Sequence, residues 1–192
     1  MTRVLLATKN LGKVAELQRI LTGFELEGAS YEPGPETGAT FAENALAKAR
    51  EGVDHTGLPT VADDSGLTVD ALNGMPGILS ARWAGRHGDD LANLQLVLDQ
   101  LADVPDERRG AAFVCAAAYA LPDGRSDVVL GELRGTLIRA PRGTNGFGYD
   151  PVFVPLGYAV TSAELAPEEK DAISHRGQAF RALNPLLAST LG

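Results

Sequence analysis

Short blocks of hydrophobic and polar residues alternate along the chain and predict a mixture of strands and helices. Residues 4–8 form an apolar run typical of a buried strand, and the helix predicted after Asn10 has apolar residues three and four positions apart. Residues 40–43 have the spacing of a capping box, which predicts a helix from there to about residue 50. Residues 89–101 predict another helix, whose buried stripe consists of Leu91, Leu94, Val97, Leu98 and Leu101.

The middle and the end of the chain add strands and one further helical segment. Residues 111–121 and 127–138 flank a Pro-Asp-Gly turn and predict a β-hairpin. Residues 60–62 and 67–69 predict two strand pieces around an acidic segment, and residues 152–154 predict another short strand. Residues 168–187 are mostly helical in pattern. This order predicts a mixed α/β domain rather than a strict βαβ repeat.

The composition indicates a folded protein that does not bind a nucleic-acid backbone. The 192 residues are 44% hydrophobic, which is enough for a buried core. The formal net charge of −8 is opposite in sign to the basic face that binds phosphodiesters. The single cysteine, Cys115, excludes an intramolecular disulfide. We recognise no signal peptide and no membrane-spanning run, and therefore expect a cytoplasmic protein.

The first polar motif, residues 8–13 with the sequence Thr-Lys-Asn-Leu-Gly-Lys, follows the first predicted strand. The N–H groups at a helix N-terminus favour an anion, and Lys13 adds a positive charge one turn later. The spacing of a Walker A loop is missing. Two interpretations stay open, namely a phosphate site and a capped helix with a solvated lysine.

Asp63 and Asp64 lie between two apolar strand pieces. Adjacent carboxylates are costly to bury unless a cation or hydrogen bonds compensate them. On a strand their side chains point to opposite faces, which predicts different roles. One is expected to bind a hard divalent metal and the other to polarise water. The alternative is an acidic turn that closes a strand.

A glycine-rich loop, residues 143–151, contains Phe147, Tyr149 and Asp150. Glycines allow the backbone to approach a ligand closely, and aromatic rings stack on a nucleobase. Asp150 is expected to accept a hydrogen bond from a ring N–H of the base. The alternative is a surface loop whose aromatic side chains pack into the core.

Other charged residues become candidates only in combination. Arg176 offers a fork of hydrogen bonds to an oxygen of a base or phosphate, and His175 and Lys170 lie nearby in sequence. Alone, a His-Arg pair on a helix is more often a solvated face. Glu36 is not distinguished by its spacing, and Glu43 is explained as the capping-box partner.

Together and in this order, the motifs resemble the inosine triphosphate pyrophosphatase family, along nearly the whole chain. The most specific segments are residues 62–67, 76–78 with 80–82, 146–151 and 174–177. The resemblance implies one two-lobed α/β domain over residues 1–192, with a long curved mixed β-sheet flanked by helices and a substrate cleft. It also implies a homodimer and Mg²⁺-dependent cleavage of ITP, dITP, XTP and dXTP between the α- and β-phosphates, which yields the monophosphate and pyrophosphate.

The resemblance also assigns roles to single residues. Asp64 matches the proton acceptor, Glu36 and Asp64 match the Mg²⁺ site, and Asp63 is expected to be a further ligand or to support one. The substrate-binding positions are matched by Thr8, Asn10, Lys13, Ser65, Phe147, Gly148, Tyr149, Asp150, Lys170, His175 and Arg176. Family members usually have a small residue where this chain has Lys9, which we count as a further candidate phosphate contact.

Two other functions remain open at the level of sequence. A Maf-like pyrophosphatase would prefer pyrimidine or methylated nucleotides, and a panel of substrates separates it from the first interpretation. A nucleotide-binding module without hydrolysis is disfavoured by Asp63 and Asp64, because binding a triphosphate gains little from added negative charge unless a metal is present.

Overall fold

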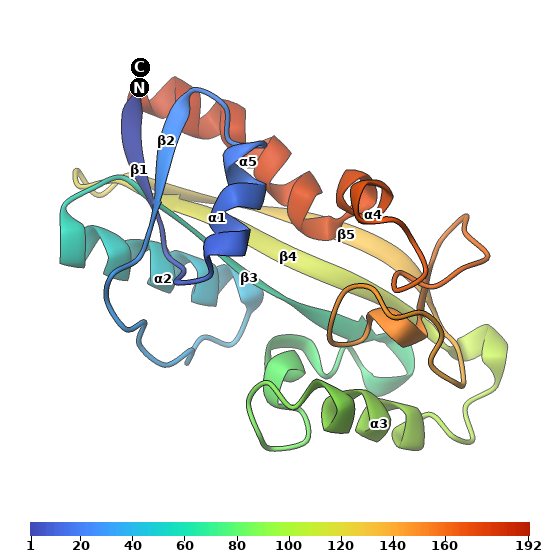
Figure 1. The fold of residues 1–192 in the computed structure, drawn as a ribbon. Helices are drawn as coiled ribbons and strands as arrows, with labels where there is room; N and C mark the ends of the chain where they lie inside the picture. The colour runs from blue at the N-terminus through green and yellow to red at the C-terminus, as the bar shows by residue number, and fades with distance from the viewer. The chain divides into compact units, whose positions relative to one another are not determined.

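The computed structural model describes residues 1–10, 13–15 and 17–192. Figure 1 shows strands and helices that alternate along much of the chain. The main elements are β1 (Thr2–Leu6), α1 (Leu11–Gln18), β2 (Phe24–Gly28), α2 (Phe41–Thr56), β3 (Thr60–Val69), α3 (Asp90–Gln100), β4 (Gly110–Ala120), β5 (Ser126–Leu137), β6 (Phe153–Pro155), α4 (Pro167–Ile173) and α5 (His175–Leu191). Within the described residues, none of the helices is long and apolar enough to cross a membrane.

The strands form a mixed sheet, as the family resemblance implied. Over the described residues the order is β2-β1-β3-β4-β5-β6. β1 pairs in parallel with both β2 and β3, whereas β5 and β6 pair antiparallel. The predicted fold class, an α/β fold with a mixed sheet flanked by helices, is confirmed.

The chain divides into two compact units. The first unit comprises Met1–Ser65, Cys115–Gly131 and Arg176–Gly192, and the second comprises Gly66–Val114 and Glu132–His175. The long strands β3, β4 and β5 therefore each contribute residues to both units.

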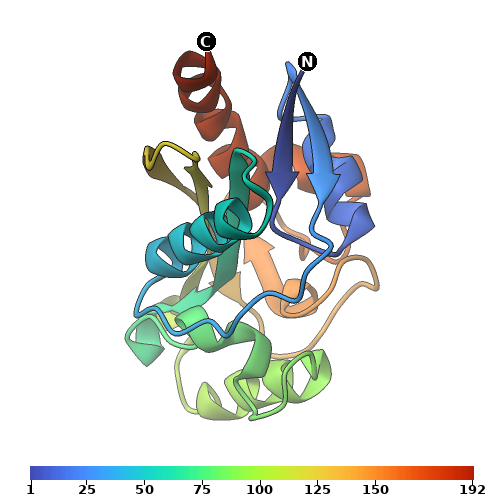
Figure 2. The same cartoon turned by 90° about the vertical axis from the view of Figure 1, so that its left-hand side faces the viewer.

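The first unit packs helices on both faces of its strands. One buried cluster joins Leu17, which lies on α1, to Phe180 and Leu183 on α5 and to Val61 on β3. A second cluster joins alanines of α2 to alanines of β3 and β4, namely Ala45, Ala49, Ala62, Ala116, Ala118 and Ala120. Successive residues of β3 and β4 thus alternate between the α1/α5 side and the α2 side. Figure 2 shows α2 on one side of these strands and α1 on the other.

The second unit has its own core. Leu94 and Val97 of α3, and Leu101 at its C-cap, pack with apolar residues of β3, β4, β5 and β6. Arg109 is buried at the end of this core, and its guanidinium donates to the carbonyl oxygens of Leu101, Leu137 and Ile138 at 2.6, 2.8 and 3.3 Å. These three bonds tie the end of α3 to the end of β5.

Several boundaries differ from the sequence prediction. The two strand pieces around the acidic segment are one continuous strand, β3. α2 runs six residues beyond the predicted end, because Gly57 first provides the left-handed turn (φ 67°) that closes a helix. β2 was missed, although its alternating sequence Phe-Glu-Leu-Glu is a strand pattern. Leu91, assigned to the buried stripe of α3, is 74% exposed.

Candidate active site

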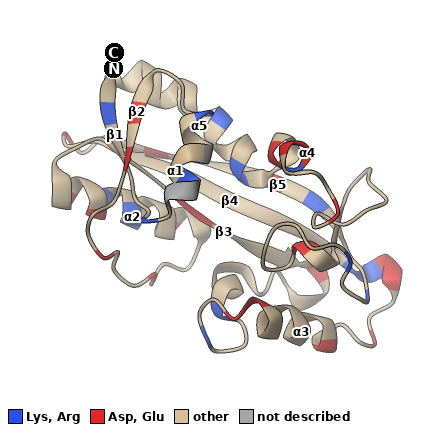
Figure 3. Ribbon diagram, viewed as in Figure 1, with Lys and Arg blue, Asp and Glu red and all other residues tan. Residues whose placement is uncertain are grey.

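Asp63 and Asp64 lie in the middle of β3 and are both buried, with 8% and 7% of their surfaces exposed. Figure 3 shows this acidic segment within the strand. Their side chains alternate, so Asp63 points to the α1/α5 side with Val61 and Asp64 points to the α2 side with Ala62. The prediction that the two acids face opposite ways is consistent with the separate partners of each.

Asp63 is surrounded by positively charged side chains. The ammonium of Lys13 lies 3.3 Å from both carboxylate oxygens, and Nε of Arg176 donates to Oδ2 at 3.2 Å. The hydroxyl of Ser65, two residues along the same face, also donates to Oδ2 at 3.2 Å. Burial raises the pKa of Asp63, but the charges of Lys13, Arg176 and Lys48 outweigh it and hold the pKa well below the ordinary range. Asp63 therefore stays ionised and holds the side chains of Lys13 and Arg176 in place.

Asp64 belongs to a second group of charges, on α2. The amide of Asn44 donates to Asp64 Oδ2 at 2.9 Å, and the ammonium of Lys48 lies 3.6 Å from Oδ1. Lys48 also forms an ion pair with Glu36 and donates to the carbonyl oxygen of Asp63 at 3.1 Å. Burial raises the pKa of Asp64 above its ordinary value, and the nearby Glu36 and Asp63 charges add to that rise against Lys48 and Asn44.

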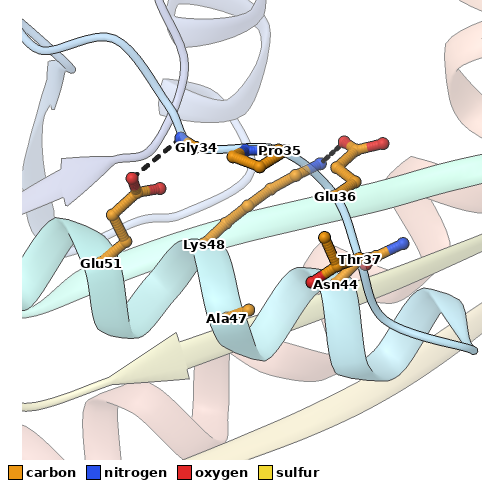
Figure 4. Close-up of a pocket in the computed structure, with 8 residues that line it drawn as sticks. All are labelled: Gly34, Pro35, Glu36, Thr37, Asn44, Ala47, Lys48 and Glu51. Carbon is orange, nitrogen blue, oxygen red and sulfur yellow. Dashed lines mark hydrogen bonds and ion pairs between the residues drawn. The ribbon is translucent and has the colours of Figure 1, made fainter.

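The loop that carries Glu36 lies along one face of α2, as Figure 4 shows. Glu51 accepts from the N–H of Gly34 at 2.8 Å, and Asn44 accepts from the N–H of Gly38 at 2.8 Å. Glu43, the capping-box residue, accepts from Ala39 N–H at 2.8 Å, while Thr40 caps the helix as predicted. A pocket of about 260 Å³ lies between loop and helix, lined by Gly34, Pro35, Glu36, Thr37, Asn44, Ala47, Lys48 and Glu51.

The motif at residues 8–13 is held mainly by its own polar groups. Thr8 Oγ1 accepts from the N–H of Asn10 at 3.2 Å, and Asn10 Oδ1 accepts from the N–H of Lys13 at 3.3 Å. The predicted helix cap at Asn10 is thus present. The ammonium of Lys9 forms an exposed ion pair with Glu32.

In the second unit, the two aromatic residues of the glycine-rich loop differ in their exposure to solvent. Phe147 is 67% exposed, with the ammonium of Lys170 lying 5.4 Å from the centre of its ring. Tyr149 is 5% exposed, and its hydroxyl donates to the carbonyl oxygen of Ser80 at 2.8 Å. The exposed aromatic face of this loop therefore belongs to Phe147, whereas Tyr149 anchors the loop.

Asp150 braces the same loop from inside. Its Oδ2 accepts from the N–H of Phe147 at 2.9 Å and from Lys170 Nζ at 2.5 Å. Gly146 leaves no room for a side chain, since a Cβ there would lie 2.2 Å from Asp150 Oδ2. The N–H of Gly148 donates to Asp90 at 3.0 Å. The loop is thus held by several hydrogen bonds, with Phe147 at its surface.

The structure assembles the predicted residues in three groups. Lys13, Ser65 and Arg176 meet at Asp63; Glu36 and Asp64 meet at Lys48; and Phe147 and Asp150 meet at Lys170. His175 instead stacks on Phe113, with ring centres 5.1 Å apart.

Sequence reasoning did not single out Asn44 and Lys48 as site residues, and it expected Asp63 to be a further metal ligand or to support one. Their spacing of four residues places Asn44 and Lys48 on one helix face, and Glu51 follows three residues later. This stripe of polar residues beside the alanines of α2 is the sequence signal from which Asn44 and Lys48 could have been identified. Among the described residues, no group of three or more His, Cys, Asp or Glu side chains is placed to hold a metal ion.

Comparisons with known proteins agree with this fold. The profile of the Ham1 family matches residues 4–186. A Streptomyces coelicolor relative named dITP/XTP pyrophosphatase is 61% identical over 200 residues, which cover 100% of both chains. A solved structure named nucleoside-triphosphatase / dITP/XTP pyrophosphatase, from Mycobacterium abscessus, is 61% identical with a TM-score of 0.82, over 96% of this chain and 100% of that one.

A HAM1 protein from Coxiella burnetii is 43% identical, with a TM-score of 0.90 over 98% of this chain and 100% of that one. The family profile, the relative compared by sequence and the solved structure each cover nearly the whole chain. The chain therefore belongs to the Ham1 family, as its motifs indicated.

Proposed function

We propose that this chain is a pyrophosphatase of non-standard purine nucleoside triphosphates. It hydrolyses ITP, dITP, XTP and dXTP between the α- and β-phosphates, to the monophosphate and pyrophosphate. The observation that carries the proposal is the pair of charge clusters on the two faces of β3, which combine cations for phosphates with carboxylates for a metal and a water molecule. The names of relatives that match the whole chain support the same reaction.

The proposed cofactor is Mg²⁺, held by Glu36 and Asp64. Both carboxylates contact the ammonium of Lys48, so they already share one cation and supply the oxygen ligands that Mg²⁺ prefers. Two carboxylates suffice where water molecules complete the coordination shell, with phosphate oxygens replacing some of them when substrate binds. The bound metal would neutralise the charge that develops on the pyrophosphate leaving group.

The chain's own cations bind the triphosphate. Lys13 and Arg176 are held in place by Asp63, and the N-terminus of α1 adds N–H groups beside Thr8 and Asn10. Ser65 and Lys9 are further candidate contacts, and Lys9 must leave its exposed partner to reach a phosphate.

Asp64 orients a water molecule and accepts its proton for in-line attack at the α-phosphorus. Its Oδ2 is held by Asn44, so the direction of the carboxylate is fixed before substrate binds. An ionised group preorganised in this way needs no rearrangement at the moment of reaction.

The second unit's loop binds the base. Phe147 stacks on it, and Asp150 and Tyr149 hold the loop, with Gly148 as a close-approach position. His175 supplies a donor to the 6-oxo group of the base, and Lys170 offsets negative charge on the triphosphate. The 6-amino group of adenine is itself a donor, so it would face a protein donor without an acceptor between them. The unpaired donors would cost about 1–3 kcal/mol of binding free energy.

The resemblance also leads us to propose a homodimer in the cytoplasm, where the nucleotide pool is. Light scattering coupled to size-exclusion chromatography tests the dimer, because a monomer mass at enzyme concentrations used in assays would exclude it.

The test of function is pyrophosphate release from ITP, dITP, XTP, GTP, ATP, CTP and TTP, each with Mg²⁺ and with chelator. We expect Mg²⁺-dependent turnover of ITP, dITP and XTP far above the standard nucleotides. The matched variant Asp64→Asn should lose most turnover, about 100-fold or more, while its circular dichroism spectrum is unchanged. Preference for CTP or TTP would reassign the enzyme to a pyrimidine pyrophosphatase, and full activity of Asp64→Asn would remove Asp64 from its role.

A further inference from the structure

Asn44 links two parts of the candidate active site through one carboxamide. It lies in the first turn of α2 and is 2% exposed. Its Oδ1 accepts from the N–H of Gly38, at 2.8 Å, and its Nδ2 donates to Oδ2 of Asp64, at 2.9 Å. A backbone N–H needs an acceptor and a carboxylate needs a donor, so the two partners allow only this orientation of the amide.

The Gly38 contact is close enough to fix the path of the loop. A Cβ at Gly38 would lie 2.6 Å from Asn44 Oδ1 and 2.8 Å from Glu43 Cβ, so the loop backbone rests directly on the helix. Two residues before Gly38, Glu36 reaches Lys48 from the same loop. The position of Glu36 therefore depends on a loop that Asn44 helps to hold.

The Asp64 contact fixes the second carboxylate. Oδ2 takes the Asn44 bond, whereas Oδ1 accepts from the N–H of Ser65 at 3.1 Å and faces Lys48 at 3.6 Å. The two oxygens of Asp64 are thus distinguished by their partners. A rotation of the carboxylate would break a bond in a buried environment, where lost hydrogen bonds are expensive.

From these contacts we propose that Asn44 is a positioning residue, which sets the Glu36 loop and the Asp64 carboxylate in register to receive a divalent cation. The inference rests on the proposed function, since it takes Glu36 and Asp64 as the metal ligands. Glu51 offers a comparison, because it accepts a hydrogen bond from Gly34 in the same loop. The hydrogen bond to Asp64, in contrast, is donated by Asn44. A brace that only stabilised the loop would act like Glu51.

The experiment measures Mn²⁺ binding to the full-length, nucleotide-free protein, by the electron paramagnetic resonance signal of free Mn²⁺. Mn²⁺ takes the same oxygen ligands as Mg²⁺. The proteins compared are wild type, Asn44→Ala, Glu51→Ala and Asp64→Asn. We expect Asn44→Ala to weaken Mn²⁺ binding about 10-fold or more, as loss of an outer partner of a metal ligand does. Glu51→Ala should weaken it distinctly less, and Asp64→Asn should weaken it most.

Steady-state kinetics with ITP gives a second readout. Asn44→Ala should lower kcat with little change in KM, and saturating metal should restore part of the loss. If the alanine variant does not fold, Asn44→Ser replaces it, because one hydroxyl cannot bridge both partners, and the same weakening is expected.

Two results would overturn the inference while leaving the proposed function intact. One is Mn²⁺ affinity in Asn44→Ala within twofold of wild type while Asp64→Asn loses binding. The other is an equal loss in Asn44→Ala and Glu51→Ala, which would reduce Asn44 to a loop brace. Wild-type Mn²⁺ affinity in Asp64→Asn would instead refute the proposed metal site, and the inference with it.

Discussion

Replacement of Lys48 by methionine would leave Glu36 and Asp64 without the cation that they share. The methylene stem and its packing on α2 are largely preserved by methionine, so the change mainly removes one positive charge. Two effects of opposite sign follow. The nucleotide-free protein should be less stable, because two partly buried carboxylates lose their counter-charge, and it should bind a divalent cation more tightly, because no ammonium competes for the same oxygens.

The magnitude follows from burial and distance. At the 3.6 Å between Lys48 Nζ and Asp64 Oδ1, the direct attraction of two unit charges is about 4–5 kcal/mol for an effective dielectric constant of about 20. The side chains of Lys48 and Glu36 are 18% and 26% exposed, so solvent and the desolvation of the ammonium offset much of this. A net loss of about 1–3 kcal/mol lies between the values for exposed and fully buried pairs. Tighter metal binding by about 10-fold corresponds to about 1.4 kcal/mol.

The assay combines urea unfolding with Mn²⁺ titration at about pH 8, above the ordinary carboxylate range. Lys9→Met is the matched control, because it makes the same substitution in an exposed ion pair, whose side chains are 46% and 85% exposed. It should change stability by about 0.5 kcal/mol or less and leave Mn²⁺ affinity unchanged. Weaker Mn²⁺ binding in Lys48→Met, at unchanged stability, would refute the reasoning and show that Lys48 supports the metal site.

Three further predictions test other parts of the molecule. Phe147→Ala should leave the melting temperature unchanged, since the ring is 67% exposed, but raise KM for ITP about 5- to 100-fold through lost base stacking; a destabilised variant with normal KM would contradict this. Burial raises the pKa of the Cys115 thiol to about 12, so iodoacetamide should label the protein in urea but not in its native state. Arg109→Met should lower the free energy of unfolding by about 3–5 kcal/mol in urea titrations, because three carbonyl oxygens, two of them in buried hydrogen bonds, lose their donor; a loss below about 1 kcal/mol would show that water replaces it.

The elements with strong periodic signals were predictable from sequence. The helix at residues 89–101 and the hairpin strands have patterns that local propensity and burial both support. The break in β3 was predicted because adjacent acids disfavour a buried strand, and only their partners make that strand stable. Lys13, Lys48, Asn44 and Arg176 come from distant parts of the chain, so their compensation of Asp63 and Asp64 is invisible to a local pattern.

The family resemblance named most residues of the candidate site, though not Asn44 and Lys48, but the contacts that these residues make could not be predicted from the sequence. A loop sequence does not reveal which of Phe147 and Tyr149 faces solvent, because that depends on the Ser80 carbonyl, reached from another segment. In the same way, the sequence presents Arg176 as a reader of bases, whereas its contact in the folded chain is Asp63. The partner of a long side chain depends on the tertiary structure that brings other residues within its reach.

The alternation of Asp63 and Asp64 makes this enzyme sensitive to a change in chain length before β3. A one-residue deletion in the turn at residues 57–59 would exchange the faces of the two acids if the strand slid to close the gap. It would also displace Thr60 from Gly52, where a Cβ on the glycine would lie 2.5 Å from Thr60 Cγ2, and bring Val61 toward the small alanine surface of α2. Insertions and deletions there should therefore be far more damaging than substitutions. The segment is thus a poor place to insert a peptide, and a change in its length should reveal a shift in the register of β3.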